Sequence, residues 1–159
     1  MIALRELLMR DAKLLVEYLN DREVQEFMEE FPYPFRVSHA IEMIKRSRDG
    51  KREVVRGIVK DDILVGIIGL LEIFRGKGKL FYLVGKEYRG QGIATEAVKI
   101  FLEEIRGRID LVYAFVAQEN TASARVLEKN GFKKAGVVRR FIRNSFGEKL
   151  DAVLYFREL

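Results

Sequence analysis

Apolar positions along the chain recur with two different periods. Some stretches place apolar residues every three or four positions, the repeat of an amphipathic helix, whereas shorter stretches alternate or run continuously, as strands do. The predicted helices are Asp11 to Leu19, Asp21 to Phe31, Ser38 to Asp49, Ala94 to Ile105 and Thr121 to Asn130. The predicted strands are Ile2 to Leu7, Val54 to Val59, Ile63 to Phe74, Leu80 to Val84, Leu111 to Val116, Val137 to Arg143 and Leu150 to Phe156.

Turn-forming residues separate these segments. Pro32-Tyr33-Pro34 ends the second helix, because each proline lacks an N–H group and restricts the residue before it. Ser38 is expected to cap the third helix. Asp61-Asp62 and Phe146-Gly147-Glu148 each join two strands as a hairpin turn.

One strand, helix and strand in the second half of the chain form a distinct unit. The run Leu111 to Val116 is almost continuously apolar, which predicts a strand buried on both faces. Together with the strand Leu80 to Val84 and the helix between them, it predicts one βαβ crossover with parallel strands. We find no internal repeat or linker, and expect one α/β domain over residues 1–159.

Composition narrows the class of protein. The 159 residues are 48% hydrophobic and 33% charged, which is typical of a folded domain rather than a disordered chain. No apolar run reaches the roughly 20 residues that a membrane helix needs. The N-terminus lacks the features of a signal peptide, so we expect a cytoplasmic protein without a membrane partner.

The absence of cysteine restricts the chemistry. Without a thiol the chain forms neither a thiolate metal site nor an acyl-thioester on itself, so any acyl transfer is direct. The single histidine, His39, lies near the start of a predicted helix and is expected to be a surface residue. We therefore expect no metal.

The net charge of +5 indicates a polyanionic partner, either a nucleic acid or a multiply phosphorylated cofactor. The basic residues are interleaved with acidic ones, and no nucleic-acid-binding motif is present. Direct nucleic-acid binding is therefore not expected.

A glycine-bearing segment, Tyr88 to Ala97, follows a predicted strand and begins a helix. Unpaired backbone N–H groups at a helix start bind anions, and the helix dipole adds to the effect. Gly90 and Gly92 let phosphate oxygens approach the main chain, and Arg89 supplies charge nearby. The alternative is that the two glycines only turn the chain.

Two other phosphate-binding motifs do not fit. A dinucleotide fingerprint requires Gly or Ala where Thr95 stands. The P-loop pattern fails because Glu87 follows Gly85-Lys86 and Leu80 occupies the place of the first glycine.

The segment resembles the signature of the GCN5-related N-acetyltransferases (GNAT), which is Arg or Gln, two residues, Gly, one residue, Gly or Ala. Arg89, Gly92 and Ala94 satisfy it, and Asn120 to Phe132 is similar to a second family segment. The resemblance implies an α/β fold of acyl-CoA N-acyltransferase type, with a mixed, largely antiparallel sheet of about seven strands and helices on both faces.

Weaker similarities lie outside these two motifs. They are closest to the branch that acetylates ribosomal-protein N-termini, the RimJ and RimL enzymes, and consist of Leu4-Arg5 with Asp11, Pro32 to Pro34, Gly136-Val137 and Asp151.

The resemblance implies a binding role for several residues toward acetyl-CoA. Backbone amides of the glycine segment would hold the pyrophosphate, the strand before it would pair with the pantetheine arm, and the last predicted helix would contribute polar side chains. Arg125 and Lys129 share one helix face and would meet phosphate, or else are solvated surface charges. The implied cofactor-binding residues are Leu83, Val84, Arg89, Gly90, Gln91, Gly92, Ile93, Ala94, Asn120, Arg125 and Lys129.

The catalytic residues follow the family pattern less closely. Leu127 occupies the position of the usual tyrosine acid, while Ser123 matches the serine proposed as acid in the ribosomal branch, or else caps the helix. A backbone N–H of Leu83 or Val84 would stabilise the oxyanion. Glu72 is the best-placed carboxylate for a general base, unless it is simply exposed at the end of its strand.

The acceptor is expected to be a protein or peptide N-terminus. An α-amino group titrates about 2.5 units below lysine, which saves about 3.4 kcal/mol of deprotonation work and suits a weak base. Alternatives are a small amine such as a polyamine, aminoglycoside or amino acid, or a non-catalytic acyl-CoA-binding module. Tyr33, Tyr82, Phe141 and Phe146 would line the acceptor groove, although Tyr82 also fits the core. The expected assembly is a monomer or homodimer.

Overall fold

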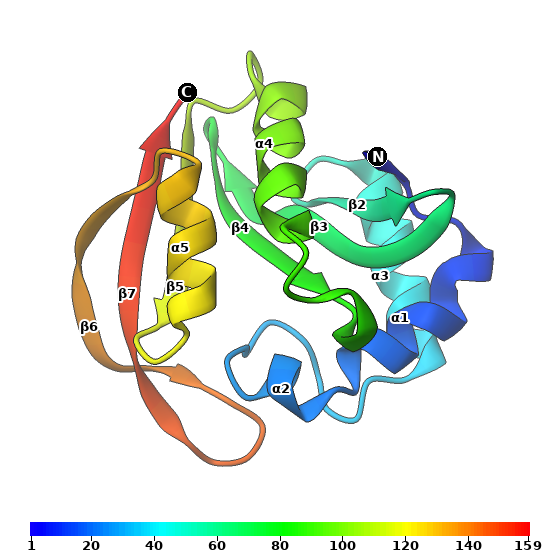
Figure 1. The fold of residues 1–159 in the computed structure, drawn as a ribbon, viewed down its shortest axis with the longest axis horizontal. Coiled ribbons are helices and arrows are strands. Elements are labelled where there is room, and N and C mark those ends of the chain that lie inside the picture. Colours follow the sequence, from blue (N-terminus) through cyan, green and yellow to red (C-terminus); the bar gives the residue numbers. More distant parts are fainter.

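The computed structural model describes residues 1–159 as a seven-stranded sheet with helices on both faces (Figure 1). This confirms the predicted fold class. The strands are β1 (Ile2–Glu6), β2 (Val54–Lys60), β3 (Ile63–Phe74), β4 (Lys77–Val84), β5 (Leu111–Ala117), β6 (Lys133–Arg143) and β7 (Lys149–Glu158). The helices are α1 (Ala12–Leu19), α2 (Arg22–Gln25), α3 (Val37–Asp49), α4 (Ile93–Ile105) and α5 (Thr121–Lys129), with short 3-10 turns η1 (Met9–Asp11) and η2 (Lys86–Tyr88).

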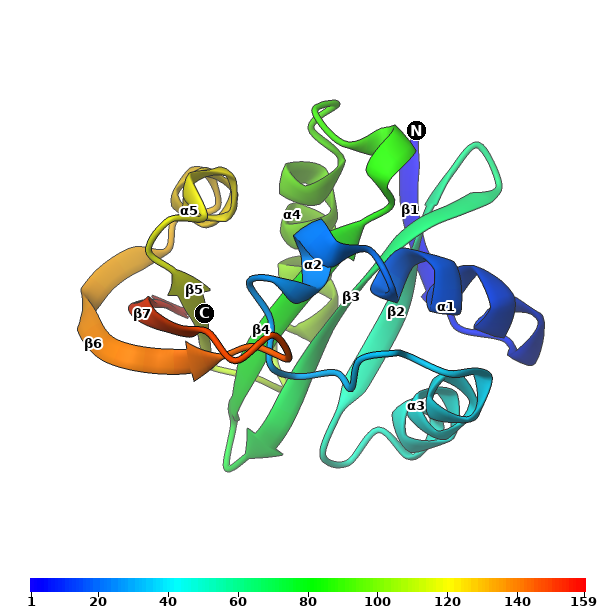
Figure 2. The same ribbon diagram turned by 90° about the horizontal axis from the view of Figure 1, so that it is seen from below.

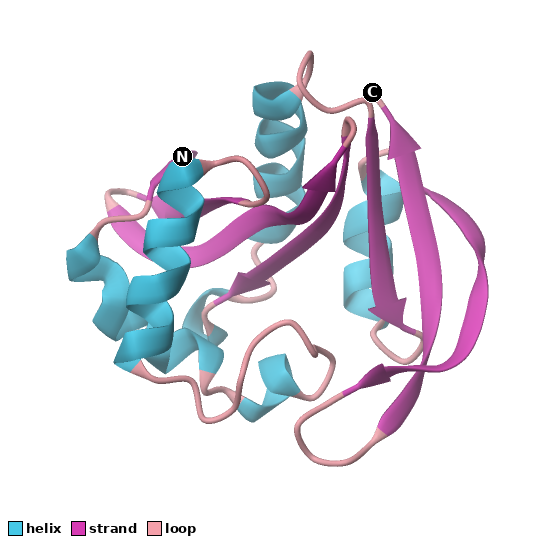
Figure 3. Cartoon of the chain, turned by 180° about the vertical axis from the view of Figure 1, so that it is seen from behind, coloured by secondary structure: helices cyan, strands magenta, loops and turns pink.

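The strand order is β1-β2-β3-β4-β5-β7-β6, and every neighbouring pair is antiparallel except β4 and β5. The parallel pair is connected through α4, as the predicted crossover requires. It is paired only where Lys77 to Lys79 face Leu111 to Tyr113. Beyond this short contact the two strands diverge, so the sheet opens like a V between its halves (Figure 3).

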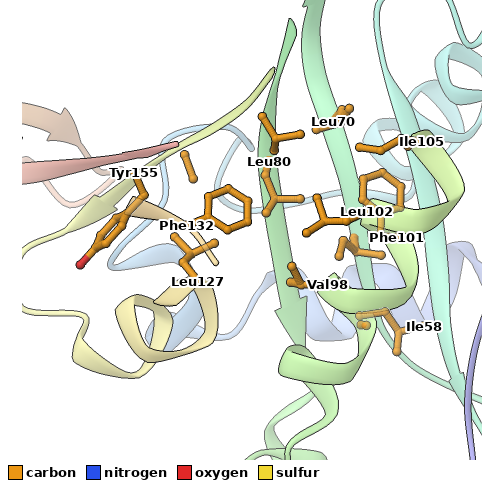
Figure 4. Close-up of a cluster of buried hydrophobic side chains, with 14 of the residues drawn as sticks. Ile58, Leu70, Leu80, Val98, Phe101, Leu102, Ile105, Leu127, Phe132 and Tyr155 are labelled. Carbon is orange, nitrogen blue, oxygen red and sulfur yellow. The ribbon is translucent and has the colours of Figure 1, made fainter. Parts of the chain in front are cut away.

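Each face of the sheet carries its own hydrophobic cluster. Successive residues of one strand point to opposite faces, so Val54 joins the cluster beneath α4 and Val55 joins the cluster beneath α1 and α3. Figure 2 shows α4 and α5 on one side of the sheet and α3 on the other. Phe101 and Leu102 of α4 are fully buried in the first cluster, which also contains Leu127 of α5 and Phe132, with Leu80 of β4 between them (Figure 4).

Close strand packing explains one glycine of β3. A Cβ atom at Gly66 would lie 2.2 Å from the carbonyl oxygen of Leu83 on β4. Any side chain there would separate β3 from β4, and β4 borders the opening of the V.

The predicted helix from Asp21 to Phe31 is wrong beyond its first turn, because α2 ends at Gln25. A continuous helix would place Phe27 and Phe31, four residues apart, on one face. Instead, Phe27 packs on Ala117 and Ile142, whereas Phe31 packs in the cluster beneath α1 and α3. The two rings are buried in different places, so the chain leaves the helix between them.

Two further predictions need correction. The N-cap of α3 is Arg36 rather than Ser38, and the Nδ1 atom of His39 accepts the Arg36 N–H at 2.9 Å. The strand β5 is buried on one face only, because α5 covers one side and Tyr113 and Phe115 remain partly exposed on the other. Aromatic side chains on this half-open face made the run look like a strand buried on both sides.

The hairpin turns at Asp61-Asp62 and Phe146 to Glu148 are confirmed, with Asp61 and Asp62 both in the left-handed region. The strands β4, β6 and β7 start earlier than predicted, at Lys77, Lys133 and Lys149. No helix combines the length and the apolar character required to cross a membrane.

Candidate active site

A cavity of about 640 Å³ occupies the opening between β4 and β5. One end is bordered by α2 and the segment after it, and the other end by the start of α4 and by α5. All predicted site residues line this cavity except Gln91 and Glu72. Those that line it are Leu83, Val84, Arg89, Gly90, Gly92, Ile93, Ala94, Asn120, Ser123, Arg125 and Lys129.

The glycine segment presents a row of unpartnered backbone donors to the cavity. Gly90 and Gly92 both have φ near +77°, and Gly92 is the N-cap of α4. The N–H groups of the six residues from Gly90 to Thr95 donate to no protein acceptor. No atom lies within 4 Å of an ideal Cβ at either glycine, so the space in front of these donors is open. This geometry fits a pyrophosphate.

The side chain of Arg89 is already engaged by protein groups. Its guanidinium donates to the Val84 carbonyl at 3.1 Å, to Asp21 at 2.5 Å and to Glu23 at 2.7 Å. Arg89 therefore ties the glycine segment to β4 and to the start of α2. Gln91 points away from the cavity, where its Oε1 accepts from Lys60 at 2.8 Å. Only the backbone amide of Gln91 is available for the cofactor.

The helix α5 adds polar groups on the opposite side of the cavity. The Oδ1 atom of Asn120 caps the helix by accepting the Ser123 N–H at 3.2 Å. Arg125 and Lys129 are exposed, line the cavity and form no ion pair. Their charges are thus available to a phosphorylated ligand.

The free edge of β4 consists of Tyr82 and Val84. The Gly85 N–H donates to the Val65 carbonyl on β3 at 2.7 Å, so the backbone groups of Leu83, two residues earlier, also face β3. Val84 faces the other way, and its carbonyl accepts from Arg89. The sequence interpretation assigned the open edge to the adjacent residues Leu83 and Val84. Because strand residues alternate, the open edge belongs to Tyr82 and Val84 instead.

Tyr82 and Ser123 meet across the opening of the V. The two hydroxyl oxygens are 2.7 Å apart, and the Tyr82 hydroxyl also donates to the Ser123 carbonyl at 3.1 Å. Burial raises the pKa of Tyr82 above its ordinary value, although the hydrogen bond to Ser123 opposes the shift. The phenol therefore remains protonated beside Ser123 at any physiological pH.

The end of the cavity beside α2 contains a largely buried carboxylate that sequence reasoning did not identify. Glu30 lines the cavity with its side chain 14% exposed, and Lys79 Nζ lies 4.0 Å from its Oε1. Burial raises the pKa of Glu30, against the opposing attraction of Lys79. Glu29 also donates its backbone N–H to Glu30, at 3.0 Å.

Glu72 lies apart from the cavity. It falls in a bulge of β3 with φ of +52°, its side chain is 66% exposed, and its Oε2 is 3.1 Å from Lys79 Nζ. The carboxylates of Glu30 and Glu72 raise the pKa of Lys79, although partial burial opposes them. The bulge directs Glu72 toward this lysine rather than into the site.

The aromatic residues predicted for an acceptor groove separate in the structure. Tyr82 lines the cavity, whereas Tyr33, Phe141 and Phe146 do not. Tyr33 and Phe146 contact each other edge to face at 5.1 Å, joining the segment after α2 to the β6–β7 hairpin. These two rings therefore pack on each other outside the cavity.

Residues 2–133 match the family described as the acetyltransferase (GNAT) domain, which spans most of the chain. The chain belongs to the GNAT family. This GNAT protein is an acetyl-CoA-dependent N-acetyltransferase, and the unpartnered amides and free cations of its cavity suit that donor.

Relatives of this GNAT enzyme differ in acceptor. It is 29% identical over 163 residues to an uncharacterised N-acetyltransferase, p20, of Bacillus licheniformis, covering 97% of this chain and 90% of the relative. Its fold is similar to RimL, a ribosomal L7/L12 alpha-N-protein acetyltransferase in complex with coenzyme A (TM-score 0.89, 16% identity, 99% and 94% coverage). It is also similar to spermidine N-acetyltransferase from Vibrio cholerae in complex with CoA and spermine (TM-score 0.86, 19% identity, 99% and 95% coverage).

In this GNAT enzyme Leu127, at the position of the usual helix tyrosine, lines the cavity and offers no hydroxyl. Leu127 is fully buried near Phe132 and Tyr155 (Figure 4). A phenol that lines the cavity comes from Tyr82 on β4. Because alternate residues of a strand face the same edge, the position of Tyr82 two residues before Val84 could have indicated its place. No local sequence feature indicates Glu30, because its place depends on the path of the chain after α2. No cluster of three His, Cys, Asp or Glu side chains has metal-binding geometry.

Proposed function

We propose that the acceptor is the α-amino group of a protein or peptide, which attacks the thioester directly while both substrates are bound. The observation that carries this proposal is Glu30, a buried carboxylate at the acceptor end of the cavity. A carboxylate with a raised pKa is a general base of moderate strength. Its strength suits an α-amino group, whose deprotonation at neutral pH costs about 3.4 kcal/mol less than that of a lysine.

The donor half of the site would position the thioester. Acetyl-CoA supplies the acetyl group. The backbone amides of Gln91 to Ala94 would hold its pyrophosphate, assisted by Arg125 and Lys129, and the free β4 edge would hydrogen-bond the pantetheine arm. The backbone N–H of Tyr82 lies on this edge, and we assign it to the acetyl oxygen, which gains negative charge as the amine attacks.

Proton transfers complete the reaction. Glu30 would accept a proton from the attacking amine, either directly or through one water molecule. As the new C–N bond forms, the C–S bond breaks, and the Ser123 hydroxyl would donate a proton to the departing sulfur. The Tyr82 hydroxyl, 2.7 Å away, would pass its proton to Ser123 and regain one from solvent, so that both hydroxyls are protonated before the next cycle. The products are the acetylated amine and coenzyme A.

A second candidate acceptor is a small cationic amine such as a polyamine. Glu26 lines the same end of the cavity as Glu30, and two carboxylates attract an amine with more than one positive charge. Glu23 lies there too, but it already pairs with Arg89. Lys79 counts against this candidate, because it places a cation beside Glu30.

An acceptor panel with acetyl-CoA as donor tests the assignment. It contains peptides with a free N-terminus and no lysine, the same peptides with a blocked N-terminus and one lysine, spermidine, an aminoglycoside and free amino acids. We expect coenzyme A release to be fastest with free N-termini. Faster turnover of spermidine would reject the peptide assignment in favour of the second candidate.

A further inference from the structure

The positive charge of this protein is concentrated on one edge strand. The whole chain has 29 basic and 24 acidic residues, and β6 contains five basic residues and no acidic one. The remainder of the chain is therefore neutral, with 24 residues of each sign. The five are Lys133, Lys134, Arg139, Arg140 and Arg143.

These five charges are exposed and unneutralised. Each residue is exposed, and none takes part in an ion pair. Two carboxylates approach the strand, but Asp151 accepts the backbone N–H of Arg140 and Glu29 that of Arg143. They satisfy backbone donors without pairing with a side-chain cation.

Protection of a sheet edge does not account for this excess. Edge strands commonly carry charges that prevent pairing with other chains. The opposite edge, β1, has one basic and one acidic residue, and its Arg5 pairs with Asp11. An edge of this same sheet is thus built without a net charge, so the β6 charges need another reason.

Apolar side chains accompany the cations on β6. Val137, Val138 and Phe141 are 44%, 39% and 41% exposed. The Phe141 ring lies 4.5 Å from the ring of Phe115 on β5, which is also partly exposed. Cations beside an accessible aromatic ring bind phosphate and stack on unpaired bases at the same time.

We propose that β6 is a binding surface for single-stranded nucleic acid, distinct from the acetyl-CoA site. The strand is about 33 Å long and lies at the far edge of the sheet (Figure 1), so a chain of phosphates can follow it without crossing the cavity. A duplex offers no unpaired base to Phe141, and an acidic peptide uses the charges without the ring. The surface adds an interaction that the interleaved sequence did not suggest.

Fluorescence anisotropy with a labelled oligouridylate tests the proposal, with saturating coenzyme A present to fill the cofactor cradle. Five phosphate contacts give a slope of about −3.5 in log affinity against log salt concentration. We expect K134Q/R139Q to weaken binding at least tenfold and to reduce the slope by about 1.4, from two lost contacts. The variant F141A should weaken binding about tenfold with the slope unchanged.

The matched control is K45Q/R48Q, which removes two exposed, unpaired charges from α3. It should bind as the unmodified protein does. Acetylation activity should be unchanged in K134Q/R139Q and K45Q/R48Q, which separates a failure of this proposal from a failure of the acceptor assignment. Equal losses in the β6 and α3 variants, affinity that is insensitive to salt, or tighter binding of an oligoglutamate or a duplex would overturn the proposal.

Discussion

The hydroxyl oxygens of Tyr82 and Ser123 lie 2.7 Å apart, although one residue belongs to β4 and the other to α5. They bridge the two half-sheets at the place where the strands have separated. The Tyr82 hydroxyl thereby reaches the cavity, although it comes neither from the helix position of the usual tyrosine nor from the glycine segment.

The first prediction concerns this pair. We expect S123A and Y82F each to lower kcat about tenfold, because loss of either hydroxyl removes the proton supply to the leaving sulfur. The loss stays modest since a thiol with a pKa near 8.5 leaves tolerably as the thiolate. The double variant should be no slower than either single variant, because the two hydroxyls act as one unit.

Rates are measured by coenzyme A release under saturating substrates. Y155F is the control, because the Tyr155 hydroxyl bonds Glu128 on α5 at 3.2 Å and does not line the cavity. Additive losses in the double variant would contradict a shared role.

The second prediction assigns the base. E30Q should lower kcat/KM about a hundredfold at neutral pH, whereas E72Q should stay within about twofold. The raised pKa of Glu30 sets the sign of the pH dependence. Activity requires the ionised carboxylate, so it falls as pH drops through this pKa, at a pH above the ordinary carboxyl range.

A pH profile of kcat/KM for the unmodified enzyme, E30Q and E72Q measures this. The acidic limb should persist in E72Q and disappear in E30Q. An unchanged acidic limb in E30Q would show that another group titrates.

The third prediction concerns the phosphate cradle. Gly92 has φ of +77° and open space before it, so Val at this position is strained and also intrudes on the donors at the start of α4. We expect G92V to raise the KM for acetyl-CoA at least tenfold. The control G107V is strained in the same way, with φ of +93° and no atom within 4 Å, but lies beyond the other end of α4.

Calorimetric titration with coenzyme A should distinguish G92V from G107V in the same way. Both variants should lose thermal stability, and only G92V should lose affinity. Equal affinities of the two variants for coenzyme A would contradict a role of Gly92 in phosphate binding.

The fourth prediction concerns stability. Asp11 is buried and accepts from Arg5 at 2.8 and 3.0 Å and from the Leu8 N–H at 2.7 Å. Burial alone would raise the pKa of Asp11, but these hydrogen bonds and the Arg5 charge lower it overall. Its stabilisation is therefore complete above the unfolded pKa and is lost as pH falls through the folded pKa.

We expect D11N to lower the free energy of unfolding by about 2 kcal/mol at pH 7. The difference from the unmodified protein should shrink as the solution is acidified below the unfolded carboxyl pKa. Urea denaturation at several pH values measures it, and D49N, at an exposed carboxylate without an ion pair, is the control. A difference independent of pH would mean that ionisation of Asp11 is not involved.

Periodicity and glycine placement were sufficient to predict most of the fold and to bring the glycine segment to the start of a helix beside the cavity. The order of strands and helices follows from local patterns, and the cradle at Gly92 is a local strand-turn-helix feature. The place of Glu30 could not be predicted from local patterns in the same way. Glu30 reaches the cavity only because Phe27 and Phe31 are buried in different clusters, which depends on residues distant in sequence.

Glu72 illustrates the opposite failure. Its position near the end of a central strand suggested a base, but a bulge changes which way a strand residue faces. Bulges depend on pairing with a neighbour, and single-strand periodicity contains no such information.

The parallel contact of β4 and β5 is confined to three residue pairs, and this has a consequence for how such enzymes diversify. One short seam joins the two half-sheets, while the walls beyond it include α2 and the segment after it, which the β6–β7 hairpin contacts through Tyr33 and Phe146. Substitutions in those walls can reshape the acceptor pocket without moving the cradle. New acceptor preferences are therefore accessible through changes in a few surface residues, with the ancestral donor chemistry retained.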